Sequence, residues 1–117
     1  MDPKIYWVGF NYVKGIGAVR LQALLDTFNN DLEEAWKAPS EKLRQSGLSV
    51  RLIESIVKVR SEIDLERIWE RISAADIGVL TWQDEAYPRL LREIYQPPPV
   101  IYLRGELLPE DEIAVAV

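Results

Sequence analysis

The sequence predicts an α-rich domain over residues 1–74, followed by the first elements of an α/β domain over residues 75–117. In the first part, apolar residues recur at intervals of three and four, which is the spacing of amphipathic helices. In the second part, short β-branched segments lie between turn residues, as strands do. The chain closes on a continuous apolar run, 113–117, of the kind found in buried parallel strands.

Composition and charge exclude several classes of function. The 117 residues include no cysteine and no histidine, so disulfides, thiol catalysis and imidazole bases are excluded. No apolar run reaches the roughly 18 residues that span a membrane, and the N-terminus lacks a signal-peptide pattern. We therefore expect a soluble, cytoplasmic protein. The net charge of -5 argues against broad nucleic-acid binding. The second half is the more acidic, so DNA contact is expected in the first half.

Capping residues predict where the first helices begin. Asp2 before Pro3 predicts a helix that carries Ile5, Val8 and Tyr12 on one face. A glycine-containing break ends this helix. A second helix then follows, with a strong amphipathic pattern of four residues at i, i+3, i+4 and i+7; these are Leu21, Leu24, Leu25 and Phe28.

Further caps and breaks divide the rest of the α-rich part. Asp31 is expected to cap a short helix that Pro39 ends, and the next helix begins directly after this proline. Gly47 breaks the pattern again, and Ser49 caps a long helical stretch. We expect this stretch to bend or restart near Asp64.

The pattern changes after residue 75. Residues 77–82 and 100–103 are short and β-branched, and both are predicted as strands. Between them, Pro88 starts a short helix and Pro97–Pro99 form an extended segment. A buried parallel strand at 113–117 needs neighbours and a crossover helix, so the chain is expected to be part of a longer protein.

A glycine-containing turn between two helices is the motif with a chemical role. Two glycines permit a tight turn and leave the backbone N–H groups uncovered. The second helix begins at this turn, where its free N–H groups and positive dipole end can hold a phosphate oxygen. The apolar residue of the turn would fill the gap between the helices, and two basic residues would add charge. This helix-hairpin-helix pattern makes five residues candidates for nucleic-acid binding: Lys14, Gly15, Ile16, Gly17 and Arg20.

The alternative to this motif is a plain turn in which the glycines only permit the bend. Two basic residues are few, and four acidic residues follow closely, which favours a hairpin that does not bind DNA. These acidic residues are Asp26, Asp31, Glu33 and Glu34.

A degenerate second copy of the motif surrounds Gly47, where one glycine remains. Four basic residues give this region its local positive charge, and we interpret them as a solvated helix face. These are Arg44, Arg51, Lys58 and Arg60.

The segment from Trp82 to Gly105 resembles the DprA/Smf family of DNA-processing proteins. The resemblance lies in Tyr87-Pro88, in the short helix with Leu90, Leu91 and Ile94, and in Pro97–Pro99 before an apolar strand that ends in glycine. It implies a sterile-alpha-motif-like (SAM-like) helix-hairpin-helix domain followed by a Rossmann-like domain, whose first core strand would be 113–117.

The same resemblance implies a role in natural transformation. Proteins of this family bind incoming single-stranded DNA, protect it and load the RecA recombinase onto it, without catalysis. Their main DNA-binding surface begins with a Gly-Ser/Thr-Arg element, which would follow residue 117. None of those residues can be assigned here, and the α-rich part would be accessory.

Two other classes of function stay open at this point. The α-rich part could dock a protein partner without direct DNA contact. An enzyme built on the Rossmann-like domain is the third class, but the sequence has neither a P-loop nor a dinucleotide-binding glycine pattern, so we expect no catalysis and no cofactor.

The aromatic residues divide into two groups. Trp7, Trp36 and Trp69 are expected in the helical core. Trp82 and Tyr87 are expected to pack against the Rossmann-like core, which would leave part of their apolar surface exposed here and open to self-association.

Overall fold

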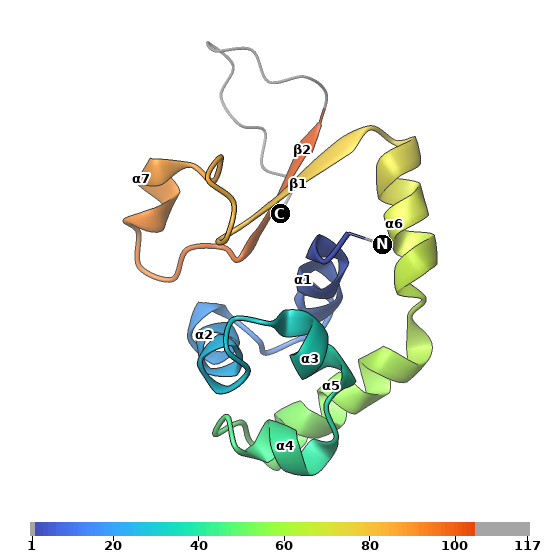
Figure 1. The fold of residues 1–117 in the computed structure, drawn as a ribbon, viewed down its shortest axis with the longest axis vertical. Coiled ribbons are helices and arrows are strands. Elements are labelled where there is room, and N and C mark those ends of the chain that lie inside the picture. Colours follow the sequence, from blue (N-terminus) through green and yellow to red (C-terminus); the bar gives the residue numbers. More distant parts are fainter. Residues whose placement is uncertain (1, 105–117) are drawn as a thin grey trace.

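The computed structural model describes residues 2–104, which form seven helices and a two-stranded antiparallel sheet (Figure 1). The helices are α1 (Lys4–Asn11), α2 (Ala18–Thr27), α3 (Leu32–Lys37), α4 (Ser40–Arg44), α5 (Val50–Glu62), α6 (Leu65–Ala74) and α7 (Arg89–Arg92). The strands are β1 (Ile77–Thr81) and β2 (Val100–Arg104). The predicted strand at 113–117 and the glycine predicted to end β2 lie outside the described residues.

Helix starts follow the predicted caps at Asp31 and Ser49, and a further cap lies at Asp64, where a bend or restart was predicted. The side chains of Asp31, Ser49 and Asp64 each accept a hydrogen bond of 3.2 Å from the backbone N–H three residues further on, at the starts of α3, α5 and α6. The break near Asp64 is confirmed, because α5 ends at Glu62 and α6 begins at Leu65. Asp2 accepts from the backbone N–H of Lys4, so α1 begins close to the predicted position.

Helix α1 is buried on several sides, which corrects the prediction of a single apolar face. It contacts α3, α6 and both strands, and Figure 1 shows it at the centre of these elements. Five of its side chains are therefore in the core: Ile5, Tyr6, Trp7, Val8 and Phe10. Tyr12, predicted on the apolar face, follows the last turn of α1 and is 51% exposed. By contrast, the four apolar residues predicted for α2 are all buried.

Trp36 is at the junction of three helices. Its ring meets that of Phe10 edge to face, with centroids 5.1 Å apart and an interplanar angle of 88°. Gly9 of α1 permits this approach, because a Cβ there would lie 3.0 Å from the Trp36 ring and 3.1 Å from Leu65 of α6. The structure confirms Trp7 and Trp36 as core residues, and Trp69 packs against the same core while partly buried.

Arg60 corrects the interpretation of the basic residues on α4 and α5. Its guanidinium is partly buried, and Nη1 donates to the carbonyl oxygens of Trp36 (2.7 Å) and Ala38 (2.6 Å) at the end of α3. Burial lowers the pKa of the Arg60 guanidinium from its usual value. Arg60 therefore ties α5 to α3 as a structural residue, while Arg44, Arg51 and Lys58 are exposed as expected.

The sheet connects the helices to the α7 region. Thr81 pairs with Val100 at one end of the antiparallel ladder. Because side chains alternate across a sheet, Val79 and Val100 join the helical core, while Leu80 and Ile101 face a second apolar cluster.

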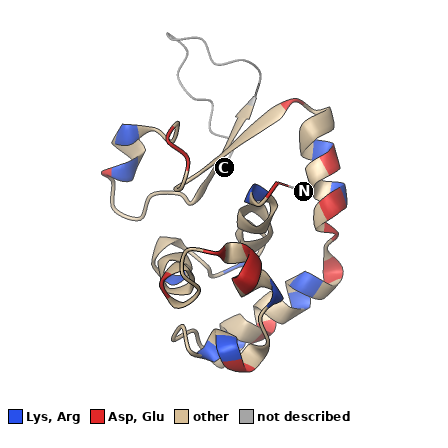
Figure 2. Cartoon of the chain, in the orientation of Figure 1, with Lys and Arg blue, Asp and Glu red and all other residues tan. Residues whose placement is uncertain are grey.

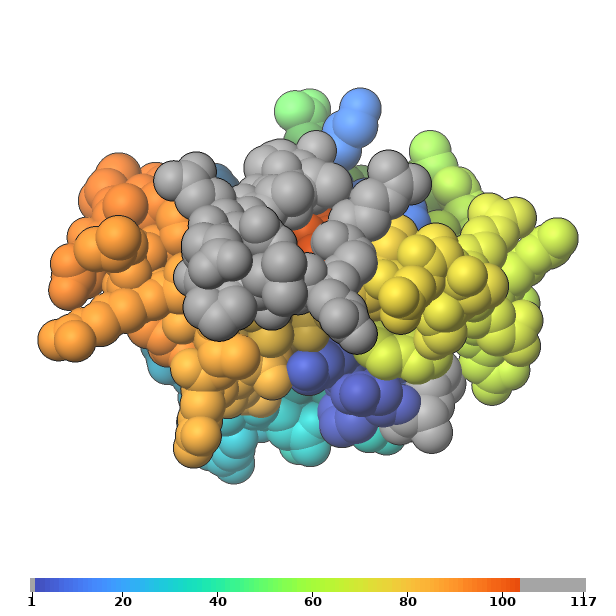
Figure 3. Space-filling model, turned by 90° about the horizontal axis from the view of Figure 1, so that it is seen from above, coloured from blue at the N-terminus to red at the C-terminus, as the bar shows by residue number. Residues whose placement is uncertain are grey.

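Tyr87 belongs to that second cluster and is only 3% exposed, which corrects the expectation that it would present apolar surface. Its hydroxyl donates to the carbonyl oxygen of Pro98 at 2.6 Å. Around α7, the exposed apolar side chains are instead those of Leu90 (78%), Ile94 and Tyr95 (88%). Figure 3 shows this segment at one edge of the molecule, opposite α6.

An ion pair fastens α1 to the turn after β1. Lys4 Nζ lies 3.0 Å from a carboxylate oxygen of Asp84 and also donates to the carbonyl oxygen of Val79. The other Asp84 oxygen accepts from the backbone N–H of Thr81 at 2.7 Å. Burial alone would raise the pKa of the Asp84 carboxyl, but the Thr81 amide and the Lys4 ammonium together lower it below its usual value.

We expect the stability contributed by Asp84 to depend on pH. A carboxyl with a lowered folded-state pKa stabilises the fold above its unfolded pKa of about 3.9, and this stability is lost as the pH falls through the folded value. Asp84→Asn should therefore lower the free energy of unfolding by about 1–3 kcal/mol at pH 7, and by less at pH 3 and below. Urea titrations at both pH values measure this. Glu85→Gln, at an exposed neighbouring carboxylate, is the control; an Asp84→Asn effect that is the same at both pH values would contradict the assignment.

Candidate nucleic-acid interface

The predicted hairpin is a turn between α1 and α2, as the sequence indicated. Helix α1 ends at Asn11 and α2 begins at Ala18, so residues 12–17 are not helical. Gly15 has a φ of +93°, in the left-handed region that favours glycine. A Cβ at this position would also lie 2.8 Å from Leu52 Cδ2. The left-handed backbone at position 15 therefore strains any residue other than glycine.

Gly17 differs from Gly15 because the fold does not require a glycine there. Its φ of -92° and ψ of -166° are extended backbone that any residue can adopt. A Cβ on Gly17 would meet no other atom within 4 Å. What glycine provides at this exposed position is an uncovered backbone at the start of α2.

The first turn of α2 has no side-chain cap. Gly17 is the residue before the helix, and no side chain accepts a hydrogen bond from the first turn. In an α-helix the first N–H groups have no partner within the helix and carry the positive end of the dipole. The start of α2 can therefore accept an anion, whereas at α3, α5 and α6 a side chain already occupies one of these donors.

The five candidate residues lie on this turn and on the first turn of α2. Ile16 is partly buried and packs against the core. It lines a small cavity together with Phe10 of α1 and Leu21 of α2, which fits the predicted role between the helices. The side chains of Lys14 and Arg20 are exposed, so both cations are available to solvent.

The acidic residues that argued against DNA binding lie further along the chain and have partners. Asp26 accepts from Gln22 Nε2 at 2.9 Å, and Asp31 caps α3. On α3, Glu33 pairs with Lys37 and Glu34 pairs with Lys42. At 1.5 Å per residue, Asp26 is about 13 Å along the helix from Gly17, beyond the Debye length of about 10 Å at 0.1 M salt. Figure 2 shows the acidic colour on α3 rather than at the hairpin.

The second copy of the motif resembles the first in its glycine but differs at its helix start. Gly47 has a φ of +84° between α4 and α5. The Ser49 hydroxyl accepts from the Leu52 N–H, so the start of α5 is capped by the protein itself. Of the two turns, the one at Gly15–Gly17 therefore leaves more donors for a ligand.

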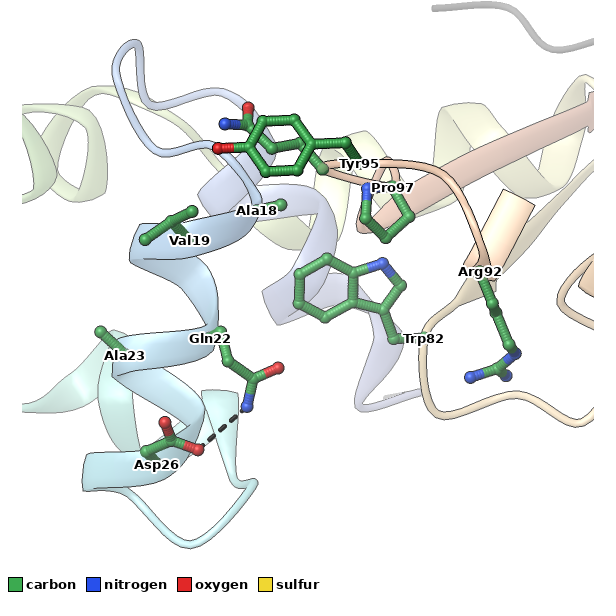
Figure 4. A pocket seen from close by; sticks show the side chains of 10 residues that line it. Ala18, Val19, Gln22, Ala23, Asp26, Trp82, Arg92, Tyr95 and Pro97 are labelled. Carbon is green, nitrogen blue, oxygen red and sulfur yellow. Dashed lines mark hydrogen bonds between the residues drawn. The ribbon is translucent and has the colours of Figure 1, made fainter. Parts of the chain in front are cut away.

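A groove that sequence reasoning missed lies beside the first turn of α2. It has a volume of about 650 Å³ and separates α2 from the segment that follows α7 (Figure 4). Trp82 and Pro97 line it opposite α2, and Tyr95 lies at its rim. The Trp82 indole Nε1 is buried and has no hydrogen-bond partner within residues 2–104. In the sequence, this groove is indicated only by residues 94–97, which combine an aromatic residue with a proline.

Metal and membrane sites are not found in the part of the chain that the structure describes. Residues 2–104 contain no group of three or more acidic side chains that could hold a metal ion. None of their helices is long and apolar enough to cross a membrane.

Comparison with known proteins identifies the family. The family model described as DNA recombination-mediator protein A matches residues 78–117. Protein Smf of Synechocystis sp. is 39% identical over 107 residues, which is 91% of this chain and 27% of that protein. The chain thus spans about a quarter of the length of this relative. No solved structure matches the chain. The resemblance read from Trp82 to Gly105 is confirmed, and the chain belongs to the DprA/Smf family.

Proposed function

We propose that the chain is the accessory N-terminal part of a DNA-processing protein of natural transformation, and that its hairpin contacts the DNA backbone. The whole protein would bind incoming single-stranded DNA and assist RecA loading, with its main DNA surface in the part of such proteins that follows residue 117. This role rests on family membership and on the recombination-mediator description of the matching model. In the cytoplasm, the α-rich part would contribute binding and no catalysis.

The observation that supports the hairpin contact is that α2, which begins directly after Gly17, has no side-chain cap. The fold does not need a glycine at this position, yet glycine keeps the backbone accessible. Free N–H groups at a helix start bind phosphate oxygens. Lys14 and Arg20 flank the same turn and would neutralise phosphate charge. We therefore assign the turn a helix-hairpin-helix role within a SAM-like domain.

Such contacts would be weak and independent of sequence. Backbone and phosphate contacts position a protein on DNA but do not read bases. A net charge of -5 limits long-range attraction. The hairpin would therefore orient DNA that the remainder of the protein holds.

Lys14→Ala is expected to weaken single-stranded DNA binding and to reduce its salt dependence. Each phosphate contact on a single strand contributes about 0.7 to the slope of log affinity against log salt concentration, so the variant should lose about that much. Fluorescence anisotropy with a labelled oligonucleotide at several salt concentrations measures the slope. Lys58→Ala removes the same charge from an exposed position on α5 and should leave the slope unchanged.

The second candidate function is a protein-docking module. The exposed side chains of Leu90 and Tyr95 favour it, because exposed apolar patches mark interaction sites. If the wild-type chain shows no DNA binding at low salt, the hairpin contact is wrong and the docking function is preferred. Equal slopes for Lys14→Ala and Lys58→Ala would also refute a contact at the hairpin.

A further inference from the structure

The groove beside α2 starts where the hairpin ends. Ala18 and Val19, the first two residues of α2, line one end of it. Ala18, Gln22 and Asp26 are spaced four residues apart, so they lie on one face of the helix. The groove runs along this face, away from the turn. Gln22 is about 6 Å along the axis from Ala18. A ligand strand with one phosphate bound at the turn can therefore place its neighbouring chemical group in the groove.

Aromatic and apolar surfaces line the groove on the side opposite α2. Trp82 is held in place by its edge-to-face contact with Trp7, whose ring centroid is 6.0 Å away at 80°. Tyr95 is not used by the core, since its side chain is 88% exposed. Figure 4 shows Pro97 on the same side as the Trp82 ring, across from Val19 and Gln22, and Tyr95 at the upper end of the view near Ala18. Flat ligands bind to such surfaces by stacking.

Polar groups at the edges of the groove add hydrogen-bonding capacity. Gln22 donates to Asp26 through Nε2, which leaves its amide oxygen as an acceptor. Arg92 lies at the rim, where it donates to the carbonyl oxygen of Asp84 at 2.7 Å and lies 4.9 Å from the centre of the Tyr87 ring. These contacts hold a cation at the opening of the groove. The volume of about 650 Å³ is within the range of small-molecule sites.

We propose that this groove receives an unpaired base of single-stranded DNA whose backbone is held at the hairpin. The inference rests on the proposed hairpin contact and adds a base-binding site to it. Continuity with the start of α2 favours a nucleic acid over an apolar peptide, because the phosphate and base sites are then one step apart on the same strand. Since paired bases are enclosed in the helix, a duplex could occupy the hairpin but not the groove.

Tyr95→Ala is expected to weaken the binding of single-stranded DNA about tenfold, the loss expected for one base–aromatic contact. Affinity for an abasic oligonucleotide of the same length should be unchanged by this substitution. The fold should tolerate the change, because the side chain is exposed. Tyr95→Phe keeps the ring and should bind like the wild type. Leu90→Ala, which removes another exposed apolar side chain that does not line the groove, should also bind like the wild type.

Anisotropy with the normal and the abasic oligonucleotides separates this inference from the hairpin contact. If Tyr95→Ala binds the normal oligonucleotide as tightly as the wild type, while Lys14→Ala still weakens both oligonucleotides, the base site is refuted and the hairpin contact stands. That result would favour an apolar protein segment as the ligand of the groove. If the wild type binds neither oligonucleotide, both proposals fail. Loss with Tyr95→Ala on the normal oligonucleotide alone supports the base site.

Discussion

Replacing Trp36 by alanine is expected to lower the free energy of unfolding by about 3–5 kcal/mol, the usual cost of removing a large aromatic side chain from a core. Trp36 is buried against Phe10 of α1, and the Trp36 ring fills the space that Gly9 leaves open. The substitution would leave a cavity where α1, α3 and α6 meet. The free energy of unfolding of a small domain is only about 5–15 kcal/mol, so the substitution would remove a large part of it. Urea denaturation followed by circular dichroism measures this loss.

Trp69→Ala is the matched control for this prediction. Trp69 is also a tryptophan on a helix, but it is only partly buried at the edge of the same core. Trp69 buries less apolar surface in the folded state than Trp36 does, so its removal should lower the free energy of unfolding by clearly less. Equal losses of unfolding free energy for the two substitutions would contradict the greater contribution assigned to Trp36 at the helix junction.

Gly15→Val is expected to destabilise the chain by about 1–3 kcal/mol. Holding a residue other than glycine in a left-handed backbone conformation costs about 1–3 kcal/mol. This cost applies because φ at position 15 is +93°, whereas the contact of the new Cβ with Leu52 Cδ2 at 2.8 Å involves the flexible end of a side chain that can move. Thermal and urea unfolding of the variant measure the total.

Gly17→Ala is the control for Gly15→Val, because it alters the other glycine of the same turn. Its backbone is extended and the space around a Cβ is open, so the change in stability should stay within about 1 kcal/mol. A loss of DNA binding in a Gly15 variant could not be distinguished from an effect of its lower stability. Tests of the hairpin in DNA binding therefore belong at Lys14 and Gly17. A Gly15→Val chain as stable as Gly17→Ala would contradict the strained geometry of the turn.

Local signals account for the parts of the fold that could be predicted from sequence. Asp31, Ser49 and Asp64 cap helices through hydrogen bonds that reach only three residues. Gly15 and Gly47 have positive φ values in the turns between helices, which glycine adopts readily. The five hairpin candidates are neighbours along the chain, so a correct turn was enough to bring them together.

Contacts between distant residues account for the corrections. Arg60 was interpreted as part of a solvated face, but it bonds to carbonyls 22 and 24 residues earlier. Tyr87 was expected to leave part of its apolar surface exposed, but its partners on β1 and β2 enclose it. The groove combines α2 with residues 82–97, which no sequence period connects.

The sequence by itself determined the order of helices and strands, the glycine turn and the family, because caps, turns and motifs act within a few residues. Tertiary structure alone decided which faces of α1 are buried, which arginine is structural and where the groove opens. Burial depends on what packs against a residue from elsewhere in the chain, and a residue's own neighbours in sequence carry little information about that.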